Sequence, residues 1–291
     1  MGVRERRRRL RFGLSTVLGY GRRGFFIPYR HAGCLPAPGA RPTYRAIEAR
    51  FRACEPRFAA TLALVEAQAE TLAGLGGEPA PAPRWSQDWF PRLDAAMAYG
   101  LLRARRPARV VEVGSGHSTR FLARARRDAG LDCAITAVDP APRAALAGLE
   151  VALVRKTLQA CGTAPFEQLA AGDFLMIDSS HILMPGSDVD LLLCHILPAL
   201  PAGVVVQIHD VFLPDDYPAE WDWRGYNEQL GVAALIAGGG WQPLFASHYV
   251  ATRMAARLAE SPLGRLPLPE GARESSLWLE KRSDHAGLTA N

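Results

Sequence analysis

Short apolar runs alternate with segments of helical period over most of the chain after residue 85. The runs that predict buried strands cover residues 108–115, 133–140, 151–158, 173–180 and 204–212. Segments that predict helices lie before and between them, at residues 89–105, 117–130, 142–149, 165–172 and 188–203. Short apolar strands that alternate with helices form parallel sheets covered on both faces. The pattern therefore predicts an α/β fold, a Rossmann-like doubly wound and mostly parallel sheet.

The two ends of the chain follow other patterns. A further helix is expected at 226–239, followed by strands at 241–250 and 275–282 that supply an antiparallel edge. Helical spacing also runs from Tyr44 to Leu75, and the Pro- and Ala-rich linker 76–85 follows it. We take this linker as a boundary between a basic, helical N-terminal region, 1–84, and an α/β domain, 85–291.

Charge is concentrated at the start of the sequence. The chain has a formal net charge of +5, but residues 1–30 hold nine arginines against Glu5, a charge of +8, which leaves −3 for the rest. Lysine occurs only at Lys156 and Lys281, so arginine is the default cation throughout. A basic tail on a mildly acidic body indicates an interaction arm rather than a nucleic-acid-binding domain.

The N-terminal segment is also amphipathic. Leu10, Leu14, Val17 and Leu18 fall on one helical face, which predicts either a short helix at a membrane surface or a helix packed on the protein. No apolar run is long enough to span a bilayer, and no secretory signal pattern is present. The five scattered cysteines form no disulfide or zinc pattern, which favours a cytoplasmic protein. The basic N-terminus allows peripheral membrane contact.

Ligands of such sheets gather beyond the carboxyl ends of the strands, so the residues there carry the functional signal. Gly114, Ser115 and Gly116 form a turn after the first predicted strand, and the following helix offers its N-terminal NH groups to an anion. A dinucleotide fingerprint needs a third glycine where Thr119 stands, so a ligand with a carboxylate fits at least as well. Asp139 ends the next strand, where a carboxylate accepts hydrogen bonds from ribose hydroxyls.

Three motifs in this order resemble those of class I S-adenosylmethionine-dependent methyltransferases. They are "EVGSG" at 112–116, Asp139, and "FLMIDSSH" at 174–181, and the final strand "LWLEK" resembles the antiparallel edge of that fold. The segments "IDSSHILMPGSDVD" and "IHDVFLPDDYPAEW" are similar to a bacterial branch associated with glycan or natural-product O-methylation.

The resemblance implies S-adenosylmethionine as cofactor and assigns residues to it. Gly114, Ser115 and Gly116 would lie against its methionine part, with Glu112 as an anchor and His117 as a contact to its carboxylate. Asp139 would bind the ribose, and Asp178 would complete the cofactor-binding set. The adenine is expected near residues 157–159.

A second group of polar residues follows the fourth and fifth predicted strands. Asp178, His209 and Asp210 stand at the strand ends, and His181 lies on the same loop as Asp178. In one interpretation Asp178, His209 and Asp210 bind a divalent cation, such as Mg, Mn or Fe, that lowers the pKa of a hydroxyl. In a second, His181 or His209 is a general base and Asp178 takes part in catalysis. In a third, these groups only satisfy loop backbone.

Aromatic residues flank the expected cleft. The segment 215–226 mixes Asp, Trp and Tyr and could either stack on a sugar or ring acceptor or pack as a capping loop. Trp85, Trp89 and Phe90 could line the opposite wall.

The sequence favours an O-methyltransferase that acts on a small-molecule or glycan hydroxyl. The alternatives are a nicotinamide-dependent oxidoreductase, a non-catalytic binding module, and an RNA methyltransferase steered by the arginines. A nucleic-acid partner is disfavoured by the acidic body, and an oligomeric state is left open.

Overall fold

The computed structural model describes residues 3–142 and 144–282. The chain divides into two compact units, of which unit 1 comprises Met1–Thr43 and Asp215–Tyr226. Unit 2 comprises Tyr44–Pro214 and Asn227–Asn291. Each unit is described by itself.

A seven-stranded sheet forms the centre of unit 2. Its strands are β1 (Arg109–Val113), β2 (Ala134–Val138), β3 (Ala152–Val154), β4 (Phe174–Ile177), β5 (Val205–Ile208), β6 (Trp241–Ala246) and β7 (Leu277–Lys281). They are ordered β3-β2-β1-β4-β5-β7-β6, with β7 antiparallel to both neighbours and the pairs from β3 to β5 parallel. Chain order reverses beside β1, which creates the crevice where open α/β sheets bind ligands. The predicted Rossmann-like fold is confirmed.

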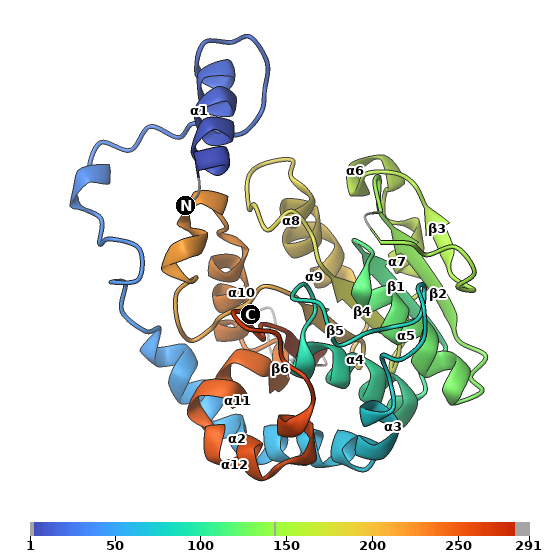
Figure 1. The fold of residues 1–291 in the computed structure, drawn as a ribbon. Coiled ribbons are helices and arrows are strands. Elements are labelled where there is room, and N and C mark those ends of the chain that lie inside the picture. The colour runs from blue at the N-terminus through green and yellow to red at the C-terminus, as the bar shows by residue number, and fades with distance from the viewer. Residues whose placement is uncertain (1–2, 143, 283–291) are drawn as a thin grey trace, which may run out of the picture. The chain divides into compact units, whose positions relative to one another are not determined.

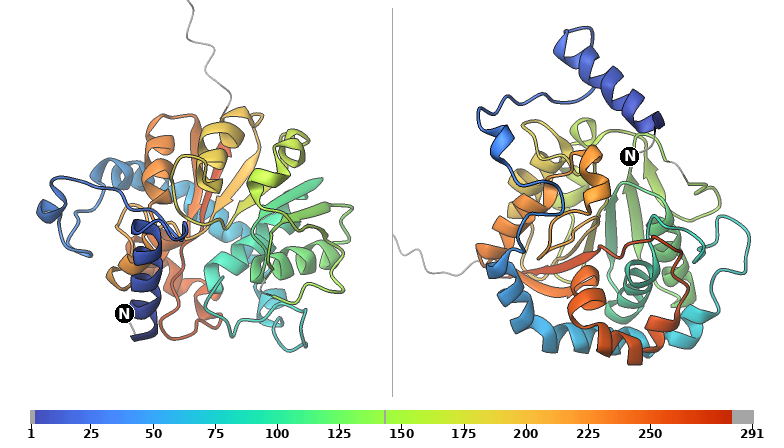
Figure 2. Two further views of the ribbon diagram at one scale, coloured as in Figure 1. Left: turned by 90° about the horizontal axis from the view of Figure 1, so that it is seen from above. Right: turned by 60° about the vertical axis from the view of Figure 1, so that its left-hand side comes forward.

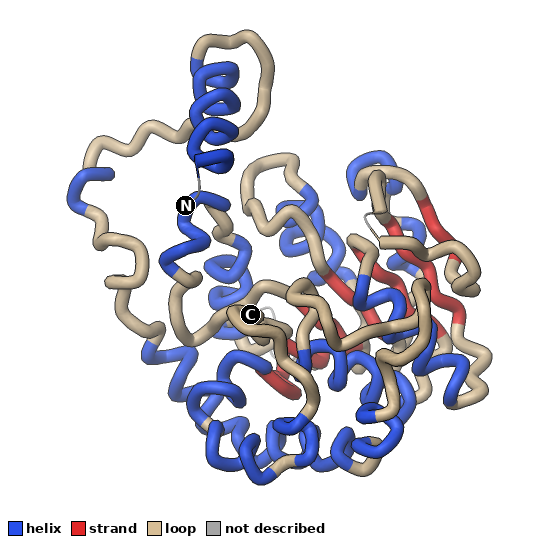
Figure 3. The backbone as a smooth tube through the Cα atoms, in the orientation of Figure 1, coloured by secondary structure: helices blue, strands red, loops and turns tan. Residues whose placement is uncertain are grey.

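Helices cover both faces of this sheet (Figures 1 and 2), and Figure 3 shows the strands in red between them. Those that connect the parallel strands are α5 (His117–Asp128), α6 (Leu158–Cys161), α7 (Ala164–Glu167), α8 (Asp188–Leu191), the π-helical turn η2 (Leu192–Ile196) and α9 (Leu197–Ala199). Those outside this set are α2 (Arg45–Glu66), α3 (Ala69–Ala73), α4 (Arg92–Arg105), α10 (Glu228–Ala237), α11 (Ser247–Arg253), α12 (Ala255–Glu260) and η4 (Pro262–Arg265). Because both faces are covered, β4 and β5 are buried along their whole length, as the continuous apolar sequence of β4 requires. The one polar residue of β5, Gln207, donates a hydrogen bond to Ser276 Oγ.

The expected domain boundary at residue 84 does not coincide with the boundary between the units, which falls after Thr43. The apolar face of α2 explains the difference. Phe51 and Phe58 on this helix are fully buried and make edge-on ring contacts with Tyr249 of α11. The helical region after Thr43 is therefore part of the core of the α/β unit rather than a separate appendage.

Two predicted elements differ from the structure. Residues 142 and 144–149 form bends, irregular backbone and one turn at 147–148 instead of a helix, and residue 143 lies outside the described residues. A segment this short does not hold a helix without packing, and none of these residues is buried. The strand expected at 241–250 ends at Ala246, where its pairing with Leu277 of β7 ends, and the chain continues as α11.

Unit 1 contains the helix α1 (Val3–Val17) and two short 3₁₀ helices, η1 (Ala32–Cys34) and η3 (Ala219–Arg224). In the described part of the chain, no helix combines the length and apolar character needed to cross a bilayer.

Candidate cofactor and acceptor site

The glycine turn lies where β1 meets its neighbours β2 and β4. Gly114 has a φ of +86° and its NH donates to Val138 at the end of β2. A Cβ at this position would lie 2.2 Å from the carbonyl oxygen of Asp178. This clash with the backbone excludes every residue except glycine at position 114. A Cβ at Gly116 would meet nothing within 4 Å. The space in front of Gly116 is thus open to a ligand, whereas Gly114 closes the turn.

Glu112 organises the start of the helix that follows. The side chain is buried, and its two oxygens accept 2.5 Å hydrogen bonds from Ser118 Oγ and Thr119 Oγ1. Thr119 Oγ1 also accepts from the NH of Gly116 at 2.9 Å, which explains a threonine where a dinucleotide site has glycine. Burial raises the pKa of Glu112 to about 7, despite the lowering effect of the two hydroxyl bonds. Glu112 therefore stabilises the turn through Ser118 and Thr119.

Asp139 is joined directly to the glycine turn. Its Oδ2 accepts a 2.7 Å hydrogen bond from Ser115 Oγ, and its Oδ1 accepts from the NH of Ala141 at 2.8 Å. The side chain is only half-buried, and a carboxylate has further lone pairs for other donors. The structure thus places Ser115 and Asp139 side by side, as one cofactor molecule that contacts both would require.

His117 begins α5 at the mouth of the turn. Its Nδ1 is buried without a hydrogen-bond partner among the described residues. Burial and the positive charges of Arg120 and Arg84 lower the pKa of His117 to about 4, so the imidazole is neutral at physiological pH. His117 Nδ1, at the N-terminus of a helix, thus has no partner in the described part of the chain and lies near the guanidiniums of Arg120 and Arg84. This environment favours the binding of a negatively charged group of a ligand.

Asp178, His181 and His209 converge at the ends of β4 and β5. Asp178 Oδ1 lies 3.2 Å from His181 Nε2 and 3.6 Å from His209 Nδ1. Both imidazoles are buried, whereas the Asp178 side chain is 45% exposed. Of these three groups, Asp178 is therefore the one that a substrate can reach.

Two carboxylates that sequence reasoning missed hold these imidazoles from behind. Glu228 Oε2, on α10, lies 2.9 Å from His181 Nδ1. Asp94 Oδ2, on α4, lies 3.4 Å from His209 Nε2, and the same carboxylate accepts from the NH groups of Ser275 and Ser276. Both are fully buried acids on helices whose neighbouring positions are mostly apolar, and an acid in such a segment is the signal that could have revealed them.

Asp210 completes the cluster. Its Oδ2 lies 3.5 Å from His181 Nε2, and its Oδ1 accepts a 3.2 Å hydrogen bond from Ser275 Oγ. Among the described non-glycine residues, only Arg106, His181 and Asp210 have positive φ, at 52°, 61° and 55°. Backbone strain of this kind costs energy and is concentrated at functional sites, so its presence at two members of one cluster indicates function.

The carboxylates decide the charge of the cluster. Burial favours neutral imidazoles, but hydrogen bonds from His181 to Asp178 and Glu228 raise the pKa of His181 well above its ordinary value. The negative charge of Asp210 and the bond to Asp178 do the same for the pKa of His209. Desolvation acts to raise the pKa of Asp178, and the two imidazoles outweigh it and hold that pKa well below its usual range. The resulting state, two imidazoliums around an ionised Asp178, opposes the interpretation of a neutral histidine base near pH 7.

The expected metal site of Asp178, His209 and Asp210 does not find support. Within residues 3–142 and 144–282, no group of three or more His, Cys, Asp or Glu side chains is arranged to hold a metal ion. The physical reason is that His209 forms ion pairs with Asp178, Asp210 and Asp94. Asp210 also accepts a hydrogen bond from Ser275. The donor set therefore does not fit a divalent cation.

The aromatic residues before α4 differ in their surroundings. Phe90 is buried and its ring centroid lies 5.3 Å from that of His209, so it does form a wall of the cluster. Trp85 is buried against Phe121 of α5, with ring centroids 5.1 Å apart. Trp89 is 55% exposed. Adenine is expected to bind near residues 157–159. Two side chains of this segment already form hydrogen bonds within the protein, since Thr157 caps α6 and Gln159 donates to the carbonyl of Gly186.

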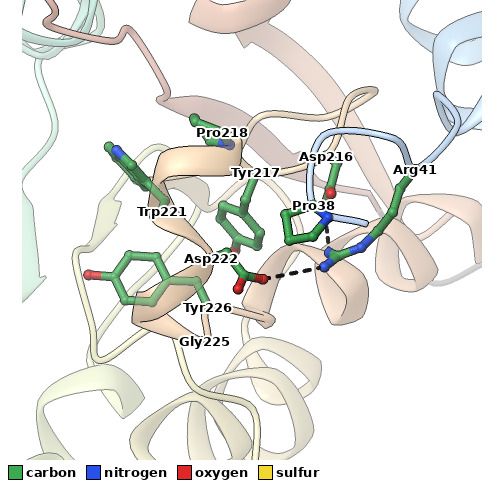
Figure 4. Close-up of a pocket in the computed structure, with 9 residues that line it drawn as sticks. All are labelled: Pro38, Arg41, Asp216, Tyr217, Pro218, Trp221, Asp222, Gly225 and Tyr226. Carbon is green, nitrogen blue, oxygen red and sulfur yellow. Dashed lines mark hydrogen bonds and ion pairs between the residues drawn. The ribbon is translucent and has the colours of Figure 1, made fainter. Parts of the chain in front are cut away.

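The aromatic and acidic segment 215–226 forms a pocket within unit 1. The cavity has a volume of about 220 Å³, and Figure 4 shows three aromatic side chains, Tyr217, Trp221 and Tyr226, around it. Arg41 reaches Asp216 at 2.9 Å and Asp222 at 3.8 Å along one side. Aromatic faces beside carboxylates can stack on a ring and accept hydrogen bonds from its hydroxyl groups.

Comparisons with known proteins agree with this geometry. Residues 111–211, from β1 to just past β5, match a family model described as a methyltransferase domain. This match includes Glu112, the glycine turn, Asp139 and Asp178, and it supports a methyltransferase. No curated protein matches the sequence.

Three solved structures are similar to the chain at low identity. The methyltransferase PaMTH1 of Podospora anserina, solved with SAH, has 16% identity over 89% of this chain and 100% of that chain, with a TM-score of 0.43. The O-methyltransferase TomG from Streptomyces achromogenes, solved with SAM, has 17% identity over 77% of this chain and 90% of its own, with a TM-score of 0.40. A putative methyltransferase from Thermobifida fusca has 13% identity over 67% and 85% of the two chains, with a TM-score of 0.38.

Proposed function

We propose that this protein is an S-adenosylmethionine-dependent methyltransferase that methylates a hydroxyl group of a small molecule or sugar. The observation that carries the proposal is the hydrogen bond between Ser115 and Asp139, which joins the glycine turn to a ribose-type carboxylate. Both lie on the same strand edge as the ionised Asp178. The methyltransferase-domain match over residues 111–211 supports the same reading.

The residues around the turn fit the cofactor. Gly116 leaves open space above the backbone, and the neutral His117 has an orphaned nitrogen for the carboxylate of a methionine moiety. Asp139 keeps lone pairs for ribose hydroxyls. When bound, S-adenosylmethionine supplies an electrophilic methyl group on a sulfonium.

Asp178 acts on the acceptor. It is the exposed member of its cluster, so the acceptor hydroxyl donates its hydrogen bond to this carboxylate. The oxygen becomes strongly acidic as its new bond to carbon forms, and even a carboxylate with a low pKa can then take its proton. His181 and His209, protonated and held by Glu228 and Asp94, fix the orientation of Asp178. General-base assistance of this kind contributes roughly 10²- to 10⁴-fold to a rate.

The chemical class of the acceptor is inferred from the side chains of the Asp178 cluster. The exposed carboxylate of Asp178 is a hydrogen-bond acceptor, which favours an acceptor molecule that presents a hydroxyl group. The ion pairs that His209 makes with Asp178 and Asp210 favour chemistry without a divalent cation, because these carboxylates already neutralise a buried imidazolium.

Two measurements test the proposal in sequence. Calorimetric titration of the full chain with S-adenosylhomocysteine is expected to show one site, and absence of binding would contradict the cofactor assignment. Transfer of a tritiated methyl group from S-adenosylmethionine is then screened over hydroxylated small molecules and glycans. Asp178→Asn should retain cofactor binding and lose roughly 10²- to 10⁴-fold in turnover. Unchanged turnover in this variant would exclude Asp178 as the acceptor contact.

A further inference from the structure

Exposed apolar side chains gather in one part of unit 1. In the described part of the chain, eleven of the fifteen large apolar side chains that are exposed lie between residues 3 and 35. The same stretch contains all nine arginines that give residues 1–30 their charge of +8. A protein surface rarely exposes so many large apolar side chains beside so many positive charges unless it binds something.

Helix α1 presents an apolar face to solvent. Val3, Leu10, Leu14 and Val17 fall on one side of the helix, and each is at least 50% exposed. The polar side carries Ser15 and Thr16 instead, at positions half a turn away.

The loop after α1 folds back on the polar side of the helix. Ser15 Oγ donates to the carbonyl of Gly21, and the NH of Arg23 donates to Thr16 Oγ1. Figure 1 shows this loop beside α1. The loop therefore covers the polar side of α1 and leaves its apolar side exposed to solvent. In a helix packed on a protein core the apolar side is the one that is covered.

A second apolar group follows in the loop. Phe25, Phe26 and Ile27 are 60%, 69% and 61% exposed and stand between Arg23 and Arg30. Bulky apolar side chains flanked by arginines are typical of segments that lie at the headgroup level of a bilayer.

From these observations we infer that α1 and the loop through Ile27 form a surface that binds an anionic lipid bilayer. The apolar face enters the boundary of the acyl chains while the arginines contact acidic headgroups. Charge argues against a second copy of this chain on the same face, because two segments of charge +8 repel each other. Apolar side chains at the centre of the surface argue against a nucleic acid, which binds mainly through its phosphates.

Vesicle flotation of the full chain tests the inference. Vesicles of phosphatidylcholine with 30% phosphatidylserine are expected to bind at least tenfold more protein than pure phosphatidylcholine vesicles, and 0.5 M salt should reduce the difference. The double variant Leu10→Ser, Leu14→Ser should lose at least tenfold in binding. Leu230→Ser is the matched control, since Leu230 is an equally exposed leucine on α10 of unit 2, and it should bind like the parent protein.

Four outcomes would overturn the inference. One is equal binding to both vesicle types, and another is a double variant that binds like the parent protein. The third is assembly instead of lipid binding, seen as a dimer by light scattering that the double variant abolishes. Tight, salt-sensitive binding to a homopolymeric RNA with no binding to anionic vesicles would likewise assign the surface to nucleic acid.

Discussion

Ser115 Oγ lies 2.7 Å from Asp139 Oδ2 and donates a hydrogen bond to it, which ties the turn after β1 to the end of β2. The two residues are 24 positions apart in sequence and are brought together because β1 and β2 are parallel neighbours. This single bond joins the two halves of the proposed cofactor site, and the first two predictions depend on it.

Asp139→Asn should weaken binding of S-adenosylhomocysteine by about ten- to hundredfold, since hydrogen bonds to a charged group contribute about 1.5–3 kcal/mol. Isothermal titration calorimetry measures the change. Asp132→Asn is the control, because Asp132 is an exposed aspartate just before the same strand. Equal affinities in both variants would remove Asp139 from the site.

Gly116→Ala should lower cofactor affinity by at least tenfold and leave the melting temperature within about 2 °C of the parent value. No protein atom lies within 4 Å of the added Cβ, so only a ligand can collide with it. Gly240→Ala adds a Cβ that is equally free of neighbours, away from the turn, and should change neither quantity. A large loss of stability in Gly116→Ala would show that the protein itself needs this glycine.

His181 and His209 should be imidazoliums at pH 7, because carboxylates around them raise the pKa of both. Nitrogen NMR of the full chain should show their titration midpoints above the ordinary value of about 6.5. Glu228→Gln removes one raising partner and should move the midpoint of His181 to lower pH, whereas Glu270→Gln, at an exposed site, should not.

The same shift predicts a pH profile for methyl transfer. If protonated imidazoles are needed to hold Asp178, turnover falls on the alkaline side as they lose their protons. Turnover that instead rises with pH through this range would establish a histidine as the general base.

Glu112 should make the protein less stable as pH rises from about 4.5 to 7. Burial raises the pKa of this carboxyl to about 7, so the folded chain keeps a proton that the unfolded chain has already lost. The sign is a loss of stability with rising pH, and the size is on the order of 3 kcal/mol. Denaturant unfolding at pH 5 and pH 8 measures it.

Glu112→Gln should abolish this part of the pH dependence and stabilise the protein at pH 8, because an amide can still bond to Ser118 and Thr119. Glu167→Gln, at an exposed residue on α7, provides the comparison. Identical pH dependence in Glu112→Gln and the parent would mean that the carboxyl titrates normally.

The sequence by itself determined the sheet and the residues along its functional edge. Apolar strands alternating with helices admit few arrangements, and polar residues that directly follow parallel strands must meet at one edge. Gly114, Asp139, Asp178 and His209 could therefore be placed in one site from their positions alone, and the structure brings them together there.

Only the tertiary structure decided what these residues contact. Asp94 and Glu228 lie on helices far from His209 and His181 in sequence, and no local pattern reports which buried acid faces which imidazole. The charge state of the cluster follows from these contacts and disfavours both a metal site and a neutral histidine base. Similarly, the apolar face of α2 could be recognised from its spacing, but its packing against Tyr249 depends on where β6 ends. The periodicity of apolar residues predicts which side of a helix or strand is buried. Which residues pack against that side depends on the tertiary structure.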